Sequence, residues 1–142
     1  MSAEGAVGVD GTVRPAEEPV IRRDERSAGF FDGAARDELR VLRCAGCGAA
    51  HGPAAVACPH CGGTDLSWAA ASGAATLVSW AVPHERASGA PAVVLALVEL
   101  AEGPWMHTRV DADPAALRAG LPLTARFVHL PDGESFPIFV PA

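Results

Sequence analysis

The chain has 142 residues and a formal net charge of −6, and 49% of its residues are hydrophobic and 20% charged. This length has room for one ordinary domain, or for a small metal module and one compact barrel, and it excludes a large enzyme with a deep internal cleft. All eleven basic residues are arginine, and they form no cluster beyond Arg22 and Arg23. A nucleic-acid binder normally carries a basic stripe that neutralises phosphates, so the composition makes nucleic acid an unlikely partner.

The sequence has no feature that predicts a membrane protein. The longest apolar run, residues 90–98, is far shorter than the roughly 20 residues needed to span a bilayer. The segment 1–10 lacks a basic region followed by an apolar core, so no secretory signal is visible and a cytoplasmic protein is expected. In a reducing compartment, closely paired cysteines are more typical of metal binding than of disulfides.

The amino-terminal part predicts a flexible leader followed by a short helix. Residues 1–28 contain few large apolar side chains and cannot bury enough surface to offset the entropy of ordering, although 19–21 could anchor an arm that orders on a partner. Residues 30–39 predict a helix with Ser27 as its candidate N-cap. Phe30 and Phe31 are large apolar side chains, and we expect them to pack either on the base of the metal module or on another subunit.

The only four cysteines have the spacing C-x2-C-x10-C-x2-C, and residues 39–43 predict a strand leading into them. Each pair can offer two thiolates from one tight turn, and Gly48 and Gly62 allow that turn a positive φ. Two such turns make a closed tetrahedral site, which indicates one structural zinc per chain rather than a catalytic metal. The predicted metal ligands are Cys44, Cys47, Cys58 and Cys61. His51 and His60 lie nearby, but four cysteines already complete the tetrahedron.

The N-terminal helix and the zinc ribbon together are predicted to span residues 29–70. The metal module itself, roughly thirty residues around the two cysteine pairs, has almost no apolar core of its own. We therefore expect the metal to supply its folding free energy, on the order of 10 kcal/mol or more, and metal removal to melt it. Two alternatives use the same thiols. A redox C-x2-C site needs only one pair in a βα context, and a rubredoxin-like iron site would make the protein red and redox-active.

The rest of the chain, residues 71–142, predicts a β-barrel. Apolar and β-branched patterns mark the strands, and 92–100 is so continuously apolar that it predicts a strand buried on both faces. Residues 113–120 carry Asp, Pro and Gly in the positions that begin and end a short helix. Five strands with a helix between the third and fourth have the order of an OB-fold. The predicted strands are 75–82, 92–100, 105–110, 123–130 and 136–140.

A four-cysteine ribbon followed at once by this barrel resembles the family of zinc-ribbon and OB-fold proteins associated with acyl-CoA enzymes. The resemblance covers residues 30–142 and predicts a mainly β fold, a rubredoxin-like zinc ribbon with an N-terminal helix followed by a five-stranded OB-fold barrel. The segments that carry it are 30–33, 39–48, 58–62, 72–73, 80–84, 91–103 and 136–142.

Members of this family are similar to non-catalytic companions of thiolase-fold enzymes, among them thiolases, acyl transferases, hydroxymethylglutaryl-CoA synthase assemblies and steroid side-chain aldolases. The resemblance implies a hetero-oligomer in which the partner supplies the catalytic residues and acyl-CoA is the substrate of the complex. The barrel would help to shape the channel for the pantetheine arm, and the ribbon would be a rigid docking surface.

The chain shows no catalytic motif of its own. No nucleophile elbow and no phosphate-binding glycine loop are present, and no thiol remains once the cysteines bind metal. The side chains left as candidates for ligand or partner contact are aromatic residues and histidines, for which a core, interface or solvated role is the alternative. They are Phe30, Phe31, Trp80, His84, Trp105 and His107.

Two functions from different classes remain open. The first is an accessory subunit of a thiolase-like acyl-CoA enzyme. The alternative is a binding module for single-stranded nucleic acid, because zinc ribbons and OB-folds both occur in such proteins. The acidic net charge and the small number of basic and aromatic residues on the predicted strands argue against it.

Overall fold

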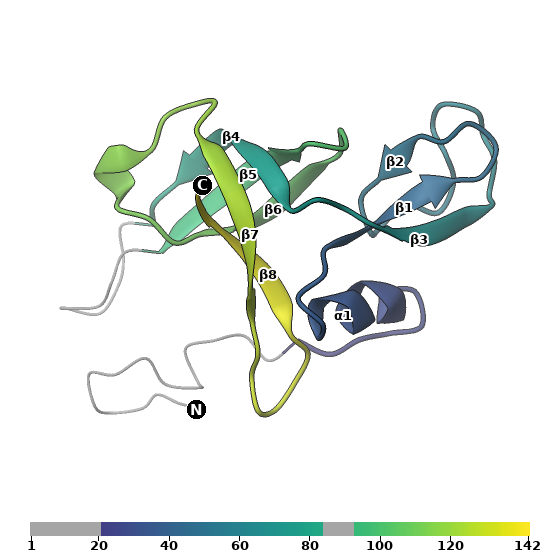
Figure 1. Ribbon diagram of the computed structural model, residues 1–142, viewed down its shortest axis with the longest axis horizontal. Helices are drawn as coiled ribbons and strands as arrows, with labels where there is room; N and C mark the ends of the chain where they lie inside the picture. Colours follow the sequence, from purple (N-terminus) through teal and green to yellow (C-terminus); the bar gives the residue numbers. More distant parts are fainter. Residues whose placement is uncertain (1–20, 84–92) are drawn as a thin grey trace.

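The computed structural model describes residues 21–83 and 93–142. A short helix and a small three-stranded sheet form one part of the molecule, and a closed five-stranded barrel forms the other (Figure 1). The mainly β fold class, with a ribbon preceding an OB-fold barrel, is confirmed. Residues 1–20 of the predicted leader and His84 lie outside the described residues. Within the described ranges, no helix is long and apolar enough to cross a membrane.

The helix α1 (Ala28–Ala34) is shorter than the predicted 30–39. It ends where the Gly33 carbonyl accepts hydrogen bonds from the N–H groups of Arg36 and Glu38, and between them Asp37 takes a left-handed φ of 59°. The chain thereby turns into the next strand.

The predicted cap at Ser27 is wrong in its chemistry. Ser27 occupies the N-cap position but makes no side-chain capping bond. Its hydroxyl instead contacts Asp24, whose carboxylate also accepts from the Ser27 N–H at 2.8 Å. The serine side chain is therefore used in a turn that precedes the helix.

The ribbon sheet has the strand order β2-β1-β3, and both pairings are antiparallel. The central β1 (Arg40–Cys44) corresponds to the predicted strand, whereas β2 (Ala50–His51) and β3 (Leu66–Ala70) were not predicted. Both strands are short, and neither contains a fully buried residue. Their sequences therefore show no clear alternation of apolar and polar residues, which is the pattern that predicts a strand. They form because β1 can pair through backbone hydrogen bonds with one strand on each side.

The barrel confirms the predicted five strands and their Greek-key order β4-β5-β6-β8-β7. A register shift between Leu77 and Ser79 marks a bulge in the first strand, and the parallel β6–β8 contact that closes the barrel has one aligned pair, Val110 with Phe139. The strands are β4 (Ala74–Ala81), β5 (Val94–Leu100), β6 (Trp105–Val110), β7 (Pro122–Val128) and β8 (Phe136–Pro141).

The predicted helix at 113–120 is a single 3-10 turn, η2 (Pro114–Ala116). Its start matches the prediction, because the Asp113 carboxylate accepts from the Ala115 N–H at 3.0 Å. Gly120 has a positive φ of 85° and donates to the Leu77 carbonyl at 2.8 Å. This bond ties the segment to β4 and leaves too few residues for an α-helix.

The prediction that the second barrel strand is buried on both faces is wrong. Burial alternates along β5, so that Val94, Ala96 and Val98 point into the core. Leu95 points outward and is 51% exposed. The outer side of this strand has no second layer within the described chain, although two of its three residues, Leu95 and Leu97, are aliphatic.

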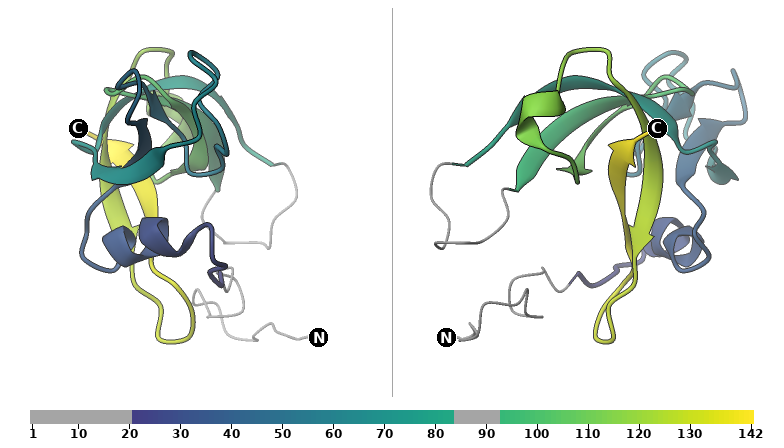
Figure 2. Two further views of the ribbon diagram at one scale, coloured as in Figure 1. Left: turned by 90° about the vertical axis from the view of Figure 1, so that its right-hand side faces the viewer. Right: turned by 60° about the vertical axis from the view of Figure 1, so that its left-hand side comes forward.

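One apolar core runs through both parts of the molecule. Phe139, Leu77 and Leu123 are fully buried in the barrel, and the same cluster continues into Phe30 and Val41 of the helix and ribbon. The helix α1 lies beside the β7–β8 strand pair in both views of Figure 2, and it contacts β8. The ribbon and barrel are therefore packed together and not merely linked.

Polar contacts at the β7–β8 hairpin add to this packing. Arg23 forms ion pairs with Asp32 at 2.6 Å and with Glu134 at 2.9 Å, which joins the segment before α1 to the hairpin. The Glu134 N–H also donates to the Ile21 carbonyl at 2.9 Å. In addition, His129 Nε2 lies 2.6 Å from Asp37 in the turn after α1. We name the Arg23, Asp32 and Glu134 contacts the hairpin clamp.

Candidate metal centre and exposed barrel face

The two cysteine turns share one backbone geometry. In the first turn, Gly48 donates its N–H to the Cys44 carbonyl at 2.8 Å, and in the second, Gly62 donates to the Cys58 carbonyl at 2.7 Å. Gly48 and Gly62 have φ values of 79° and 77°, so the predicted left-handed glycines are confirmed. The first cysteine of each turn is buried and the second is exposed.

This geometry gathers the four sulfurs into one cluster. All four Sγ atoms lie within 4.8 Å of one another, and the Cys44–Cys61 and Cys47–Cys58 pairs are 3.6 and 3.5 Å apart. Zinc–sulfur bonds of about 2.3 Å in a tetrahedron separate the sulfurs by about 3.8 Å. The cluster therefore fits one structural zinc held by four thiolates, which leaves no coordination position for water or substrate.

The sulfurs differ in how readily they lose a proton. The backbone N–H of Cys47 points at the Cys44 sulfur and is the main reason why the pKa of Cys44 falls to about 7. At Cys47 the Ala49 N–H lowers the pKa, but hydrogen bonds with the neighbouring thiols, led by Cys58, outweigh it and raise the pKa. Neighbouring thiolates repel one another, so a cation is needed to hold the whole set deprotonated, and metal binding releases protons.

His51 lies beside the cluster in a role that the sequence did not suggest. Its Nε2 is 3.3 Å from the Cys58 sulfur, and its ring centroid is 6.4 Å from that of His60. The sequence raised both histidines only as alternative ligands. The structure makes His51 an outer partner of a ligand sulfur, the arrangement by which such partners orient ligands and tune the metal. Only the folding of β2 onto β1 brings it there, so spacing alone could not reveal it.

Phe30 and Phe31, predicted to pack either on the ribbon or on a partner, bury most of their surface within this chain. They are 8% and 9% exposed, their rings meet edge to face at 5.3 Å, and Phe30 also lies 6.4 Å from Trp68. Each belongs to the shared apolar core. These aromatic residues fix α1 beneath the ribbon and leave little surface for another subunit.

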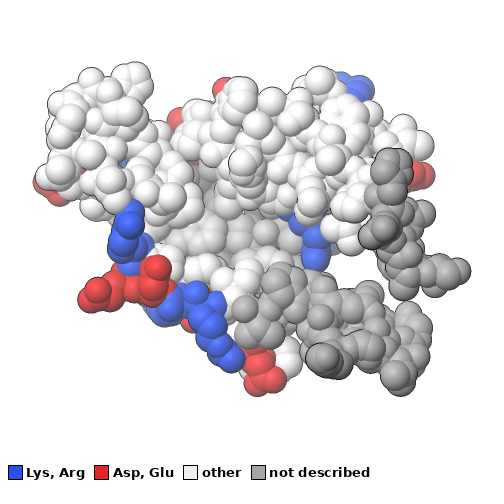
Figure 3. All heavy atoms as spheres, turned by 180° about the vertical axis from the view of Figure 1, so that it is seen from behind, with Lys and Arg blue, Asp and Glu red and all other residues white. Residues whose placement is uncertain are grey.

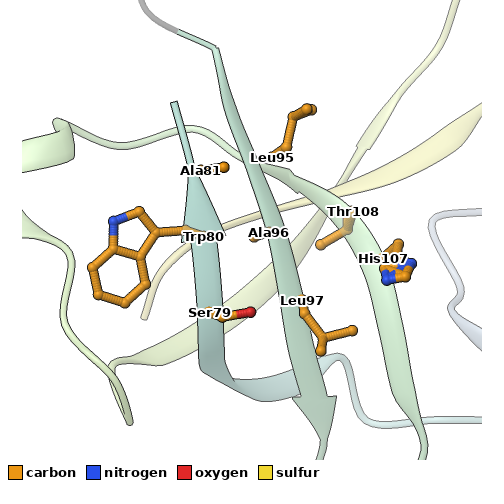
Figure 4. Close-up of a pocket in the computed structure, with 8 residues that line it drawn as sticks. All are labelled: Ser79, Trp80, Ala81, Leu95, Ala96, Leu97, His107 and Thr108. Carbon is orange, nitrogen blue, oxygen red and sulfur yellow. The ribbon is translucent and has the colours of Figure 1, made fainter. Parts of the chain in front are cut away.

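The candidate contact residues of the barrel fall on two sides of β4–β6 (Figure 4). Ser79, Leu97 and His107 are aligned neighbours in the sheet and point to one side. Trp80, aligned with Ala96, points to the opposite side and is 38% exposed. The structure thus separates Trp80 from His107, which the sequence could not do.

Trp105 lies in β6 opposite Glu99 and is 57% exposed. An open hollow of about 470 Å³ lies over β4–β6, and its lining side chains are mostly apolar or small (Figure 4). The lining residues are Ser79, Trp80, Ala81, Leu95, Ala96, Leu97, His107 and Thr108.

His129 connects a serine and an aspartate, a combination that invites comparison with a nucleophilic triad. Its Nδ1 is 2.6 Å from the Ser135 hydroxyl, and its Nε2 is 2.6 Å from Asp37. The His129 and Asp37 side chains are 47% and 68% exposed. A nucleophilic triad needs a desolvated site with oxyanion donors. We interpret this exposed cluster as a link between the hairpin and the α1–β1 turn.

Family models match both parts of the chain. Residues 31–67 match the ChsH2 rubredoxin-like zinc ribbon domain, and residues 68–128 match the ChsH2 C-terminal OB-fold domain.

Two curated relatives are similar over most of the chain. One is a probable enoyl-CoA hydratase alpha subunit of Thermomonospora curvata, 33% identical over 87% of this chain, and the other is the 3-oxo-4,17-pregnadiene-20-carboxyl-CoA hydratase alpha subunit of Mycobacterium tuberculosis, 34% identical over 80%. The chain spans only 39% and 37% of the lengths of these relatives.

Solved structures give the same relationship. The Ltp2-ChsH2(DUF35) aldolase contains a chain that is 30% identical, with a TM-score of 0.73 and coverage of 87% of this chain and 98% of that one. A DUF35 protein of unknown function from Sulfolobus solfataricus, 16% identical with a TM-score of 0.59, covers 83% of this chain and 86% of its own, and it shares the fold. With its ribbon, its barrel and its whole-length match to the chain of the aldolase, this protein belongs to the ChsH2/DUF35 family.

Proposed function

We propose that this chain is a non-catalytic subunit that docks on a thiolase-fold acyl-CoA enzyme and helps to form the channel for the CoA thioester. One observation carries the proposal. The chain covers 98% of a chain in a structure described as an aldolase of two named components, Ltp2 and ChsH2(DUF35). A protein that matches nearly the whole of one such chain is expected to work with a second component.

The burial of polar groups supports a non-catalytic role. Among the described residues no polar or charged residue is buried. General acids and bases are normally tuned by desolvation inside a cleft, and this chain places its described histidines and carboxylates at the surface or half-buried. The four thiols belong to the metal cluster and leave no nucleophilic cysteine.

The zinc cluster would give the ribbon a fixed shape without taking part in the reaction. Its closed ligand set keeps substrate away from the metal. A ribbon whose turns are held by metal and whose base is packed against the barrel is rigid, and rigidity lowers the entropy lost on docking.

A groove between the ribbon and the barrel supports the channel part of the proposal. Its volume is about 320 Å³, and it lies where the α1–β1 turn, the β3–β4 connection and β7 meet. Polar side chains such as Ser72 and Thr124 line it together with Phe127. Such a mixed lining suits the amide-bearing pantetheine arm, and a partner placed over the groove would close it.

A second candidate function is the same accessory role in a hydratase. Both curated relatives are hydratase alpha subunits, and this observation favours it. The two candidates differ in the fold of the partner and not in the role of this chain. The nucleic-acid alternative has less support, because the net charge is −6 and the exposed face of the central barrel strands carries Leu95 and Trp105.

Coexpression tests the proposal. The tagged chain is produced with each thiolase-fold protein and each hydratase of its source genome, and the complexes are isolated at two salt concentrations. We expect one thiolase-fold protein to copurify at a fixed ratio, with about one zinc per copy of this chain. Copurification of a hydratase alone would favour the second candidate. Binding of a single-stranded oligonucleotide that weakens steeply with salt would favour the nucleic-acid module.

A further inference from the structure

The strand β5 has a largely apolar outer side that no part of the described chain covers. Its inner residues, such as Val94 and Val98, are fully buried, yet two of its three outer residues, Leu95 and Leu97, are also aliphatic, and the third is Glu99. Leu95 is 51% exposed, and Val93 just before the strand is 46% exposed. Strands that are apolar on both sides are typical of sheets covered by a layer on each side. The inner layer is the barrel core, and the outer layer is missing from the described chain.

The neighbouring strands extend this apolar side. Leu97 is aligned with Ser79 on β4 and with His107 on β6, and Leu95 is aligned with Ala81. Ser79 and Ala81 have small side chains, so a hollow remains over the sheet. Leu95 and Leu97 also line this hollow (Figure 4). We define the outer face of β4–β6 by the outward residues Ser79, Ala81, Leu95, Leu97, Glu99, Trp105, His107 and Arg109.

This face is the part of an OB-fold that binds ligands. The second and third strands of the barrel, here β5 and β6, form the binding surface in OB-folds that take oligonucleotides and oligosaccharides. Binding of single strands relies on a positively charged groove together with stacking aromatics. Here two leucines stand at the centre, and the molecule has no lysine and a net charge of −6. A polyanion is therefore a poor fit.

The distribution of charge agrees with a protein partner. Seen from the side opposite that of Figure 1, most of the described surface is uncharged, and arginine and acidic side chains gather along its lower part (Figure 3). Three of the five exposed large hydrophobic residues in the described chain, Val93, Leu95 and Trp105, belong to this face or border it. Two charged side chains lie beside the anchors, because Arg109 is aligned with Leu95 and Glu99 with Trp105. Aromatic and aliphatic anchors with polar residues at their rim are typical of a protein interface.

We propose that the outer face of β4–β6 is the surface on which the thiolase-fold subunit docks, with Leu95 and Trp105 as its anchors. The inference rests on the proposed function, because the partner is the one named there. A separate protein is the better occupant than a small ligand, because the two anchors stand up from an open surface and do not enclose a cavity. The other apolar candidates, Phe30 and Phe31, are already used within the chain.

The test uses the thiolase-fold protein that copurifies with the wild-type chain, and measures its dissociation constant by calorimetry with purified full-length variants. Leu95→Glu and Trp105→Ser should each weaken binding about 30-fold or more, as expected for interface anchors. Ala116→Glu is the matched control, because it adds the same charge at an exposed position of the η2 turn, outside the outer face and outside the ribbon. It should leave the dissociation constant unchanged. Zinc content and the unfolding midpoint show that each variant is folded.

Hydrogen exchange on the wild-type complex provides a reading that needs no variant. Amides of β5 and β6 should gain protection when the partner binds, more than those of β7. If Leu95→Glu and Trp105→Ser bind as tightly as wild type, or if the new protection lies elsewhere, the face is wrongly assigned while the proposed function stands. Failure of the wild-type chain to bind any thiolase-fold protein would overturn both. A wild-type dimer in sedimentation that Leu95→Glu converts to monomer would make a second copy the occupant and overturn this inference alone.

Discussion

The residues around the four sulfurs and the residues inside the barrel show opposite patterns of burial. Residues 45–48 and 59–62 are exposed, and in these turns the buried side chains are those of Cys44 and Cys58. The barrel buries Phe139, Leu77 and Leu123 completely. We therefore expect the metal end of the ribbon to depend on bonds to one ion, whereas the barrel depends on the area of apolar surface removed from water.

The base of the ribbon, like the barrel, is stabilised by buried apolar side chains. Val41 of β1 and Phe30 of α1 are part of the continuous apolar core. The expectation that the metal module melts without its ion therefore applies to only part of the ribbon. We expect the cysteine turns and β2 to depend on the ion, and α1 and β1 to remain packed on the barrel.

Removal of the metal should have the largest effect and should separate the two regions most clearly. A chelator withdraws a binding free energy on the order of 10 kcal/mol from the cysteine turns. The Gly48 and Gly62 amides, which donate to the Cys44 and Cys58 carbonyls, should lose hydrogen-exchange protection while the Leu77 amide keeps it. Simultaneous loss of protection in the barrel would show that the two regions form one cooperative unit.

A cavity in the barrel core should destabilise the barrel, whereas metal removal should destabilise the cysteine turns. Phe139→Ala removes a fully buried ring and should lower the free energy of unfolding by about 3–5 kcal/mol, measured in urea. Val140→Ala, at the next and half-buried position, is the control and should cost much less. Equal costs at the two positions would contradict the assignment of Phe139 to the centre of the core.

Loss of the His51 side chain, which contacts a ligand sulfur, should weaken zinc binding and leave the stability of the barrel unchanged. His51→Phe removes the nitrogen that lies 3.3 Å from the Cys58 sulfur and should lower the zinc affinity about 10-fold, measured by competition with a chromophoric chelator. His60→Phe is the matched control, because His60 is exposed on the second cysteine turn. If both variants bind zinc equally, the His51 contact has no role in holding the metal.

The smallest effect is expected at the hairpin clamp, and it should depend on pH. The hydrogen bond from Arg23 lowers the pKa values of Glu134 and Asp32 below their ordinary values of 4.5 and 3.8. Carboxylates with lowered pKa values add stability above those ordinary values and lose it as the pH falls through the lowered ones. The difference in thermal midpoint between wild type and Arg23→Gln should therefore be present at pH 7 and shrink as the pH falls below these ordinary values.

Arg118→Gln, which removes a different exposed arginine, serves as the control for that measurement. Its midpoint should follow that of wild type across the same range. A difference for Arg23→Gln that persists unchanged in acid would show that the guanidinium acts without the two carboxylates.

Local signals made the metal site predictable from the sequence. Cysteine spacing and the following glycines describe turns of a few residues, and the positive φ of Gly48 and Gly62 requires no knowledge of the rest of the fold. The order of the barrel strands was predictable for a similar reason, because apolar residues recur along each strand and the short segment at Asp113 is punctuated.

Features that depend on tertiary contacts could not be predicted in this way. β3 exists because β1 presents an edge to it, and Ser27 does not cap α1 because Asp24 takes its hydroxyl. The contact of His51 with Cys58 likewise needs β2 to fold back. The wrong prediction for β5 is the most informative, because its sequence is nearly continuously apolar, as in a strand covered on both sides, and the described residues cover only one side.

The central claim is that this chain supplies structure and a docking surface while another chain supplies the catalysis. It is tested most directly by the turnover of a β-hydroxyacyl-CoA thioester by the purified chain, by its thiolase-fold partner and by the two together. The account predicts no turnover by the chain alone, and turnover by the complex that exceeds that of the partner alone. Turnover by the chain alone, or equal turnover by the partner with and without it, would contradict the account.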